Sequence, residues 1–180
     1  MKLDDNDFML FGLPERFAID RTDLDARWRR LQGSTHPDRF ASEGATARRL
    51  AMQWSVRINQ AYRRLSEPLT RAAYLCELRG APIAAHSNTA MPGNFLIQQL
   101  AWREALEDAD GAAALAALEV EVLAAERDLL AQLATLLDDK PEPILAAERV
   151  RALMFITRFR ADLAERLDAD LELLEASGGG

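Results

Sequence analysis

Residues 21–40 read RTDLDARWRRLQGSTHPDRF, an arginine-rich segment that runs into the tripeptide His-Pro-Asp. At 100° per residue, its apolar side chains fall on one side of an amphipathic helix with the buried stripe Leu24, Trp28 and Leu31. We expect this helix to begin after Thr22 or Asp23, whose side chains suit an N-cap, and to run to about Ser34. Pro37 then breaks it, because proline lacks a backbone N–H and restricts the residue before it.

The flank of this helix opposite much of the apolar stripe carries positive charge. Arg27 and Arg30 lie together there, and Arg29 lies apart from them. The helix is followed by the tripeptide His36, Pro37 and Asp38. The proline stiffens a reversal, the aspartate offers an ionised acceptor, and the imidazole has two nitrogens that can form hydrogen bonds. On spacing alone, these residues favour the simpler interpretation of a helix-ending histidine, a proline that breaks the helix and a turn aspartate.

A second amphipathic helix of matching length is predicted over residues 46–65. Its buried stripe has a spacing of three to four residues and comprises Leu50, Trp54, Ile58, Ala61 and Leu65. Short helices flank the pair, one over residues 8–11 that Asp7 caps and Gly12 ends, and one over residues 69–78. Two longer helices packed antiparallel, with short ones at their ends, predict a small compact domain.

The chain divides into this N-terminal domain, over residues 1–79, and a second helical domain, over residues 94–176. Residues 80–93, GAPIAAHSNTAMPG, lack periodicity and are predicted to form a linker. Short connections separate three helical segments beyond it, 94–109, 111 or 112–137, and 143–176. Short connections favour antiparallel neighbours, so we expect a three-helix bundle, followed by a disordered tail over residues 177–180.

Composition and charge agree with an all-α protein that has two different surfaces. Alanine, leucine, arginine and glutamate dominate, and there are only 9 glycines and 7 prolines. Residues 21–79 contain 12 arginines against 6 acidic residues, whereas residues 81–180 contain 8 basic residues against 18 acidic ones. This asymmetry indicates two surfaces with different partners, or two solvated faces. The net charge of −7 argues against nucleic-acid binding.

Other classes of function find little support in the sequence. Cys76 is the only cysteine, which excludes an intramolecular disulfide and suits a reducing compartment. The N-terminus is acidic where a signal peptide is basic, and no apolar stretch is long enough to span a bilayer. The chain has no paired spacing typical of a zinc site, no nucleophile elbow and no glycine-rich loop. We therefore expect a cytoplasmic monomer without a metal, cofactor, membrane contact or enzymatic activity.

The segment that begins at Asn94 carries two apolar strips. Trp102 and Leu106 lie within about 20° of Phe95 on a helical projection, and these three predict a core stripe. A second strip with acidic neighbours lies on a separate flank and comprises Leu96, Ile97, Leu100, Glu104 and Asp108. Periodicity leaves two interpretations open: a helix wedged between both neighbours of its bundle, or an exposed partner site with an acidic rim.

Several strings of the sequence together resemble one family. LQGSTHPDRF, with its flanking helices, resembles a J-domain, and LFGLPERFAID, RINQAY, EPLTRAAYL and FLIQQLAWREALED narrow the resemblance to the HscB family of iron–sulfur cluster assembly. It covers nearly the whole chain and implies a co-chaperone that docks on the DnaK-like ATPase HscA and stimulates its ATP hydrolysis. The chaperone-binding residues would be His36, Pro37, Asp38, Arg27 and Arg30. Arg39 stands where many J-domains have lysine, which keeps the charge but changes its geometry.

The same resemblance implies that the second strip binds IscU, the scaffold on which the cluster is built. The matching residues are Leu96, Ile97, Leu100, Glu104, Asp108 and Phe155. Asp108 replaces a glutamate, and Ala101 stands where an acidic residue is typical, which removes one charged contact. Two sites on one chain would raise the effective concentration of IscU at HscA.

Overall fold

The computed structural model describes residues 2, 4–35, 44–84 and 90–178, with side chains through position 170. Within those ranges every regular element is a helix, which confirms the prediction of an all-α fold. In chain order the elements are α1 (Asp7–Phe11), α2 (Arg21–Thr35), α3 (Ala45–Ser66), α4 (Pro68–Leu78), α5 (Gly93–Glu107), α6 (Ala112–Ala134), the π-helical turn η2 (Thr135–Asp139) and α7 (Pro143–Gly178).

The short helix α1 is capped differently from the prediction. Its N-cap is Asn6, whose side-chain oxygen accepts a hydrogen bond from the N–H of Met9 (2.9 Å). Asp7 is the first helical residue, fully buried, and its carboxylate pairs with Arg57 (2.8 Å) and Arg64 (3.2 Å) of α3. The prediction was wrong because asparagine and aspartate suit an N-cap about equally. The two arginines that form ion pairs with Asp7 are distant in sequence.

Helices α2 and α3 form an antiparallel hairpin. α2 begins at Arg21, slightly before the predicted start, because Asp20 accepts a hydrogen bond from the N–H of Thr22 (2.8 Å) and so acts as the cap. In α3 the predicted stripe is buried at most positions, but Leu50 is 49% exposed and its neighbour Ala51 lies in the core. The spacing of apolar residues predicts that a helix has a buried stripe, but it predicts less well which residues belong to that stripe near the end of the helix.

The connection between the two halves is partly packed. Ala81 and Ile83 are buried, and the guanidinium of Arg151 on α7 donates hydrogen bonds to the carbonyl oxygens of Ile83 (3.1 Å) and Ala90. Residues 85–89 of the predicted linker lie outside the described residues. At both of its ends, therefore, this segment is held against α7.

The second half is the expected three-helix bundle. α6 and α7 pack along their length, and α5 lies against them through Phe95 and Trp102, whose rings contact aromatic rings of α7. The indole N–H of Trp102 also donates to Glu121 of α6 (2.9 Å). α7 continues through residues 177–178, which the sequence had assigned to an irregular tail, and residues 179–180 lie outside the described part.

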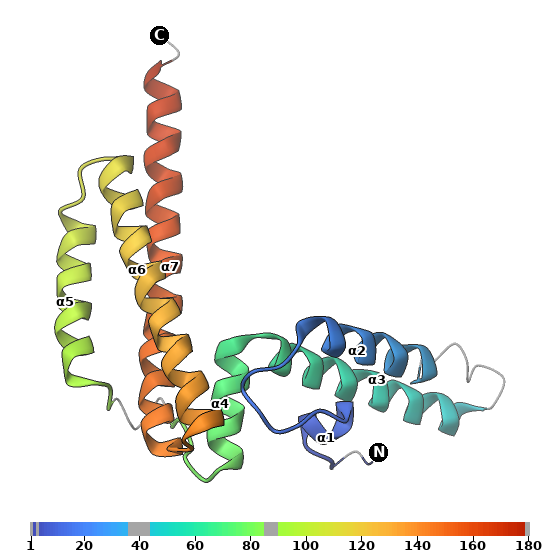
Figure 1. Cartoon of the computed structure of the whole chain (residues 1–180). Helices are drawn as coiled ribbons and strands as arrows, with labels where there is room; N and C mark the ends of the chain where they lie inside the picture. The colour runs from blue at the N-terminus through green and yellow to red at the C-terminus, as the bar shows by residue number, and fades with distance from the viewer. Residues whose placement is uncertain (1, 3, 36–43, 85–89, 179–180) are drawn as a thin grey trace.

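The two halves are arranged as an L (Figure 1). The α2–α3 hairpin extends away from the bundle, and α4 stands at the corner, where it packs on α7 and on η2. The buried apolar residues of both halves form one continuous cluster that passes through α4. The hairpin and helix α5 thus occupy different arms of the L.

Candidate functional site

The end of the α2–α3 hairpin carries the tripeptide that the sequence singles out. His36, Pro37 and Asp38 lie outside the described residues. α2 ends at Thr35, whose hydroxyl donates to the carbonyl of Leu31 (2.9 Å), and the chain is next described at Gly44, before α3. These two ends of α2 and α3 are the ones remote from the bundle (Figure 1).

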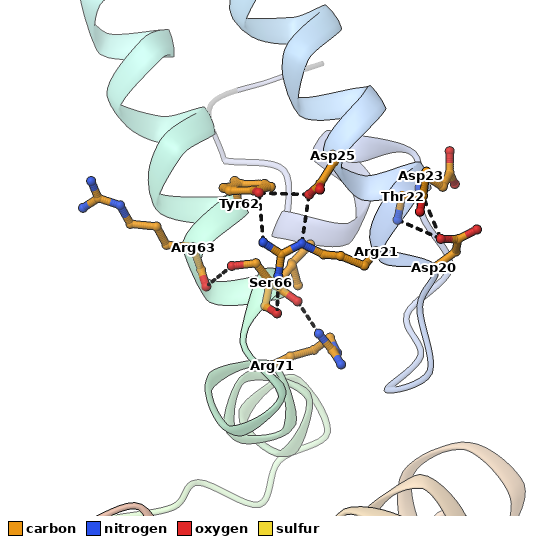
Figure 2. A network of polar contacts seen from close by, with 10 residues as sticks. Asp20, Arg21, Thr22, Asp23, Asp25, Tyr62, Arg63, Ser66 and Arg71 are labelled. Atoms are coloured by element: carbon orange, nitrogen blue, oxygen red, sulfur yellow. Dashed lines mark hydrogen bonds and ion pairs between the residues drawn. The ribbon is translucent and has the colours of Figure 1, made fainter. Parts of the chain in front are cut away.

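A polar seam holds α2 to α3 at the other end of the hairpin (Figure 2). The guanidinium of Arg21 donates to Asp25 (2.9 Å), to the hydroxyl of Tyr62 (3.0 Å) and to the carbonyl of Ser66 (2.9 Å). Tyr62 in turn donates to Asp25 (2.9 Å), and this hydrogen bond is the main reason that the pKa of Asp25 lies below its usual range. The bond to Asp25 is likewise the main reason that the pKa of Arg21 is raised.

The seam continues toward the far end of the hairpin. The ring of Trp28 stacks on Tyr62, with centroids 4.7 Å apart, and its indole N–H donates to Asn59 (3.0 Å). The side-chain amide of Gln32 donates to the same oxygen of Asn59. These contacts have directional geometry, so they define both the register and the angle of the two helices.

Of the two predicted docking arginines, Arg27 is engaged within the molecule. Its Nε donates to Asp23 (2.8 Å), which raises the pKa of Arg27, and its Nη1 donates to the carbonyls of Phe11 (2.9 Å) and Gly12 (2.7 Å) at the end of α1. Gly12 has a positive φ of 63°, and a Cβ there would lie 3.2 Å from the same guanidinium. Arg27 therefore fastens α1 to the hairpin.

Arg30 is exposed, and so is Arg29, which the sequence placed apart from the docking pair. Arginine side chains in exposed positions can pair with carboxylates of another protein. The positive surface that the described part of α2 presents is thus centred on Arg29 and Arg30. Helical periodicity could not distinguish Arg27 from Arg30, because the contacts of Arg27 with the carbonyls of Phe11 and Gly12 come from a segment outside α2.

Helix α5 has one packed face and one exposed apolar face. On the packed face Phe95 is 8% and Trp102 is 1% exposed. The second strip is open to solvent, with Leu96, Ile97 and Leu100 exposed by 48%, 72% and 64%. The strip is therefore not wedged between two helices, and its three apolar side chains are exposed, as the second interpretation requires.

Charged residues border the exposed strip as expected. Glu104 and Asp108 are both exposed, and Ala101 is exposed on the same helix. Phe155 of α7 differs from the leucines, because it is half-buried and lies edge-on to Phe95, with ring centroids 5.8 Å apart. The ring of Phe155 therefore packs against α5 and is also partly exposed at the nearby surface.

Sequence reasoning did not identify Arg103 as part of this surface. Its guanidinium carbon lies 5.7 Å from the centre of the Phe155 ring, within cation–π range, and so bridges α5 and α7. Met154, 39% exposed on α7, is a further apolar residue of that helix that the sequence left unassigned. The contact between Arg103 and Phe155 depends on the packing of α5 on α7, which the sequence pattern does not specify.

The thiol of Cys76 is shielded from solvent. Cys76 is fully buried in α4, and burial raises the pKa of its thiol to about 11, so the thiol stays protonated near neutral pH. The residues described include no group of three metal-ligating side chains. Nor do they include a helix that is both long and apolar enough to cross a membrane.

Comparison with known proteins gives a consistent result. The HSCB C-terminal oligomerisation domain matches residues 91–164. The co-chaperone protein HscB homolog of Burkholderia cenocepacia is 48% identical over 178 residues, 97% of this chain and 99% of that one. The homolog from Bordetella petrii is 47% identical over 161 residues, 89% of this chain and 95% of that one.

Solved structures agree in fold. The chaperone HscB from Vibrio cholerae superposes with a TM-score of 0.79 at 38% identity, covering 92% of this chain and 99% of that one. The human co-chaperone HscB superposes with a TM-score of 0.86 at 24% identity, covering 92% and 84%, and supports the fold alone. From the extent and identity of these matches, the chain belongs to the HscB family of co-chaperones.

Proposed function

We propose that this chain is a non-enzymatic co-chaperone that binds the iron–sulfur scaffold IscU and delivers it to HscA, stimulating the ATPase of that DnaK-like chaperone. The observation that carries the proposal is the exposed strip of α5, where three large apolar side chains face solvent while the opposite face of the helix is packed. Clusters of this kind with a charged rim are typical of protein-binding sites.

The α2–α3 hairpin supports the second half of the proposal. Its described surface presents Arg29 and Arg30, and its far end carries the segment with His36, Pro37 and Asp38. A positive surface of this kind suits an acidic patch on an ATPase domain. The catalytic groups would belong to HscA, and this chain would act as its regulator.

Steady-state ATP hydrolysis by the cognate HscA tests the hairpin. We expect the wild-type chain to accelerate hydrolysis and His36→Gln to lose nearly all of that acceleration. A wild-type chain without any effect would reject the co-chaperone function. A fully active His36→Gln would reject only the assignment of the turn.

Calorimetric titration with IscU tests the strip on α5. The double variant Leu96→Ala/Leu100→Ala should weaken binding by about 2 kcal/mol, or roughly 30-fold in Kd, because apolar anchors at the centre of an interface carry much of its energy. Val120→Ala on α6 is the matched control, since Val120 is also 66% exposed but lies on a different helix. Equal affinities for the double variant and the wild type would exclude α5 as the IscU site.

A further inference from the structure

Asp138, in the π-helical turn η2, makes an unusual contact across the corner of the L. Its side chain is only 3% exposed. One carboxylate oxygen accepts a hydrogen bond from the backbone N–H of Phe17 (2.7 Å), and the other accepts from the N–H of Ala18 (2.8 Å). The two donors belong to the irregular segment between α1 and α2, more than a hundred residues away in sequence.

Both N–H groups need an acceptor from elsewhere, because they lie in a segment without helix or strand. An ionised carboxylate is the strongest acceptor that a side chain offers, and here each of its oxygens serves one donor. The nearby guanidinium of Arg16, at 3.8 Å, adds a weak attraction. Asp138 therefore fastens the N-terminal half to the bundle at one defined point.

Arg71 of α4 and Arg79, the C-cap residue of that helix, hold the same segment from the other side. Arg79 donates to the carbonyl of Glu15 (3.0 Å) and to that of Leu137 in η2, so that one guanidinium spans both halves. Arg71 donates to the carbonyl of Phe17 (2.8 Å) and lies over the Phe17 ring, 5.1 Å from its centre. The segment around Phe17 is thus clamped between α4 and η2.

We propose that Asp138 is a positioning residue that sets the angle between the α2–α3 hairpin and the bundle, and hence the placement of a partner on α5 relative to the far end of the hairpin. The apolar cluster at the corner holds the halves together, but apolar contacts are not directional. The paired hydrogen bonds of Asp138 are directional, and they select one orientation among those that the cluster tolerates.

Substitution has a clear expected effect on these bonds. Asparagine would present one oxygen and one NH2 group to two N–H donors, so that one donor would face another donor. Alanine would leave both N–H groups without their acceptor. Asp139→Asn is the matched control, because Asp139 is the next residue, carries the same charge and is exposed.

The angle can be measured without any partner. Spin labels at Gln60→Cys on α3 and Ala117→Cys on α6, both exposed positions, report the distance between the two arms by pulsed electron resonance. The native Cys76 is fully buried and does not compete for the label. We expect one narrow distance distribution in the otherwise wild-type chain and in Asp139→Asn, and a broadened or split one in Asp138→Ala and Asp138→Asn.

A loss of stability alone would not produce this result. Leu163→Ala, a truncation far along α7 at a position 1% exposed, should lower Tm and leave the distance distribution narrow. Should the Asp138 variants not fold, Arg79→Met removes the other tie between the halves and should broaden the distribution in the same way. A distribution as narrow as wild type in the folded variants would overturn the proposal.

The functional consequence rests on the proposed function. Asp138→Ala should bind IscU and stimulate HscA in the absence of IscU as the wild type does, because both surfaces are intact. In this variant, the extra acceleration of ATP hydrolysis that IscU adds should be roughly tenfold smaller than in the wild type, because the two sites are no longer held in one geometry. If the wild type fails to bind IscU, the proposed function fails, while the distance measurement still decides the role of Asp138.

Discussion

The α2–α3 hairpin and helix α5 are both candidate binding elements, yet they are held in place by different forces. The hairpin is joined by the polar seam of Arg21, Asp25 and Tyr62, whereas α5 is anchored by the rings of Phe95 and Trp102. Directional hydrogen bonds hold the hairpin at one register. Aromatic packing on one side of α5 secures the helix and leaves its opposite face exposed.

The two regions also differ in what they expose. α2 presents arginines, and α5 presents leucine and isoleucine with an acidic rim. Exposed charges act over about 10 Å at moderate ionic strength and are screened by salt, whereas apolar burial is not. We therefore infer that affinity at the hairpin depends strongly on salt, and that affinity at α5 depends on it much less.

The largest effect is expected from breaking the anchor of α5. Trp102→Ala should lower the free energy of unfolding by about 4 kcal/mol, because it leaves a large cavity and removes the hydrogen bond to Glu121. Leu100→Ala on the exposed face of the same helix is the control and should stay within about 0.5 kcal/mol. Urea denaturation measures both, and equal losses would mean that α5 does not have two distinct faces.

The next largest effect tests the buried ion pairs that hold α1 on the hairpin. Asp7→Asn leaves Arg57 and Arg64 facing a neutral group and should cost about 3 kcal/mol. Asp4→Asn, at an exposed position of the same terminus, should have little effect. Thermal unfolding distinguishes the two, and similar Tm values for both variants would contradict a stabilising role for Asp7.

A smaller effect separates the two predicted docking arginines. Arg27→Ala should lower Tm measurably, since Arg27 holds the end of α1, and it should also weaken HscA binding. Arg30→Ala should weaken binding, more so at low salt, and leave Tm unchanged because Arg30 is exposed. Paired Tm and affinity measurements check this, and an unchanged Tm for Arg27→Ala would contradict the contact with α1.

The smallest effect concerns Cys76 at the corner of the L. Because burial raises the pKa of its thiol to about 11, above that of a free thiol, the buried group stabilises the fold below the unfolded pKa. That contribution is lost as pH rises from about 9 through about 11. The difference in Tm between wild type and Cys76→Ala should therefore shrink over this range; a constant difference would show that burial does not raise the pKa of the thiol above its value in the unfolded chain.

Much of the fold was predictable because it depends on local pattern. The helices over residues 45–66 and 112–134 follow directly from apolar spacing, and their predicted bounds are close to those observed. The two faces of α5 were also visible in the sequence, although their exposure was not. The error at Asp7 arose because its arginine partners are distant in the chain, and the error at Leu50 arose near a helix end, where Ala51 takes the buried position.

The sequence by itself determined the all-α class, the strips on α5 and the family, because helical periodicity and ordered motifs are local properties. Only the tertiary structure decided that Leu96, Ile97 and Leu100 face solvent. It also decided that Arg27 donates a hydrogen bond to the end of α1, and that Asp138 accepts hydrogen bonds from the segment between α1 and α2. Each of these features depends on which parts of the chain pack against each other in the folded protein. The free energy of such contacts comes from residues many positions apart, and no local pattern specifies them.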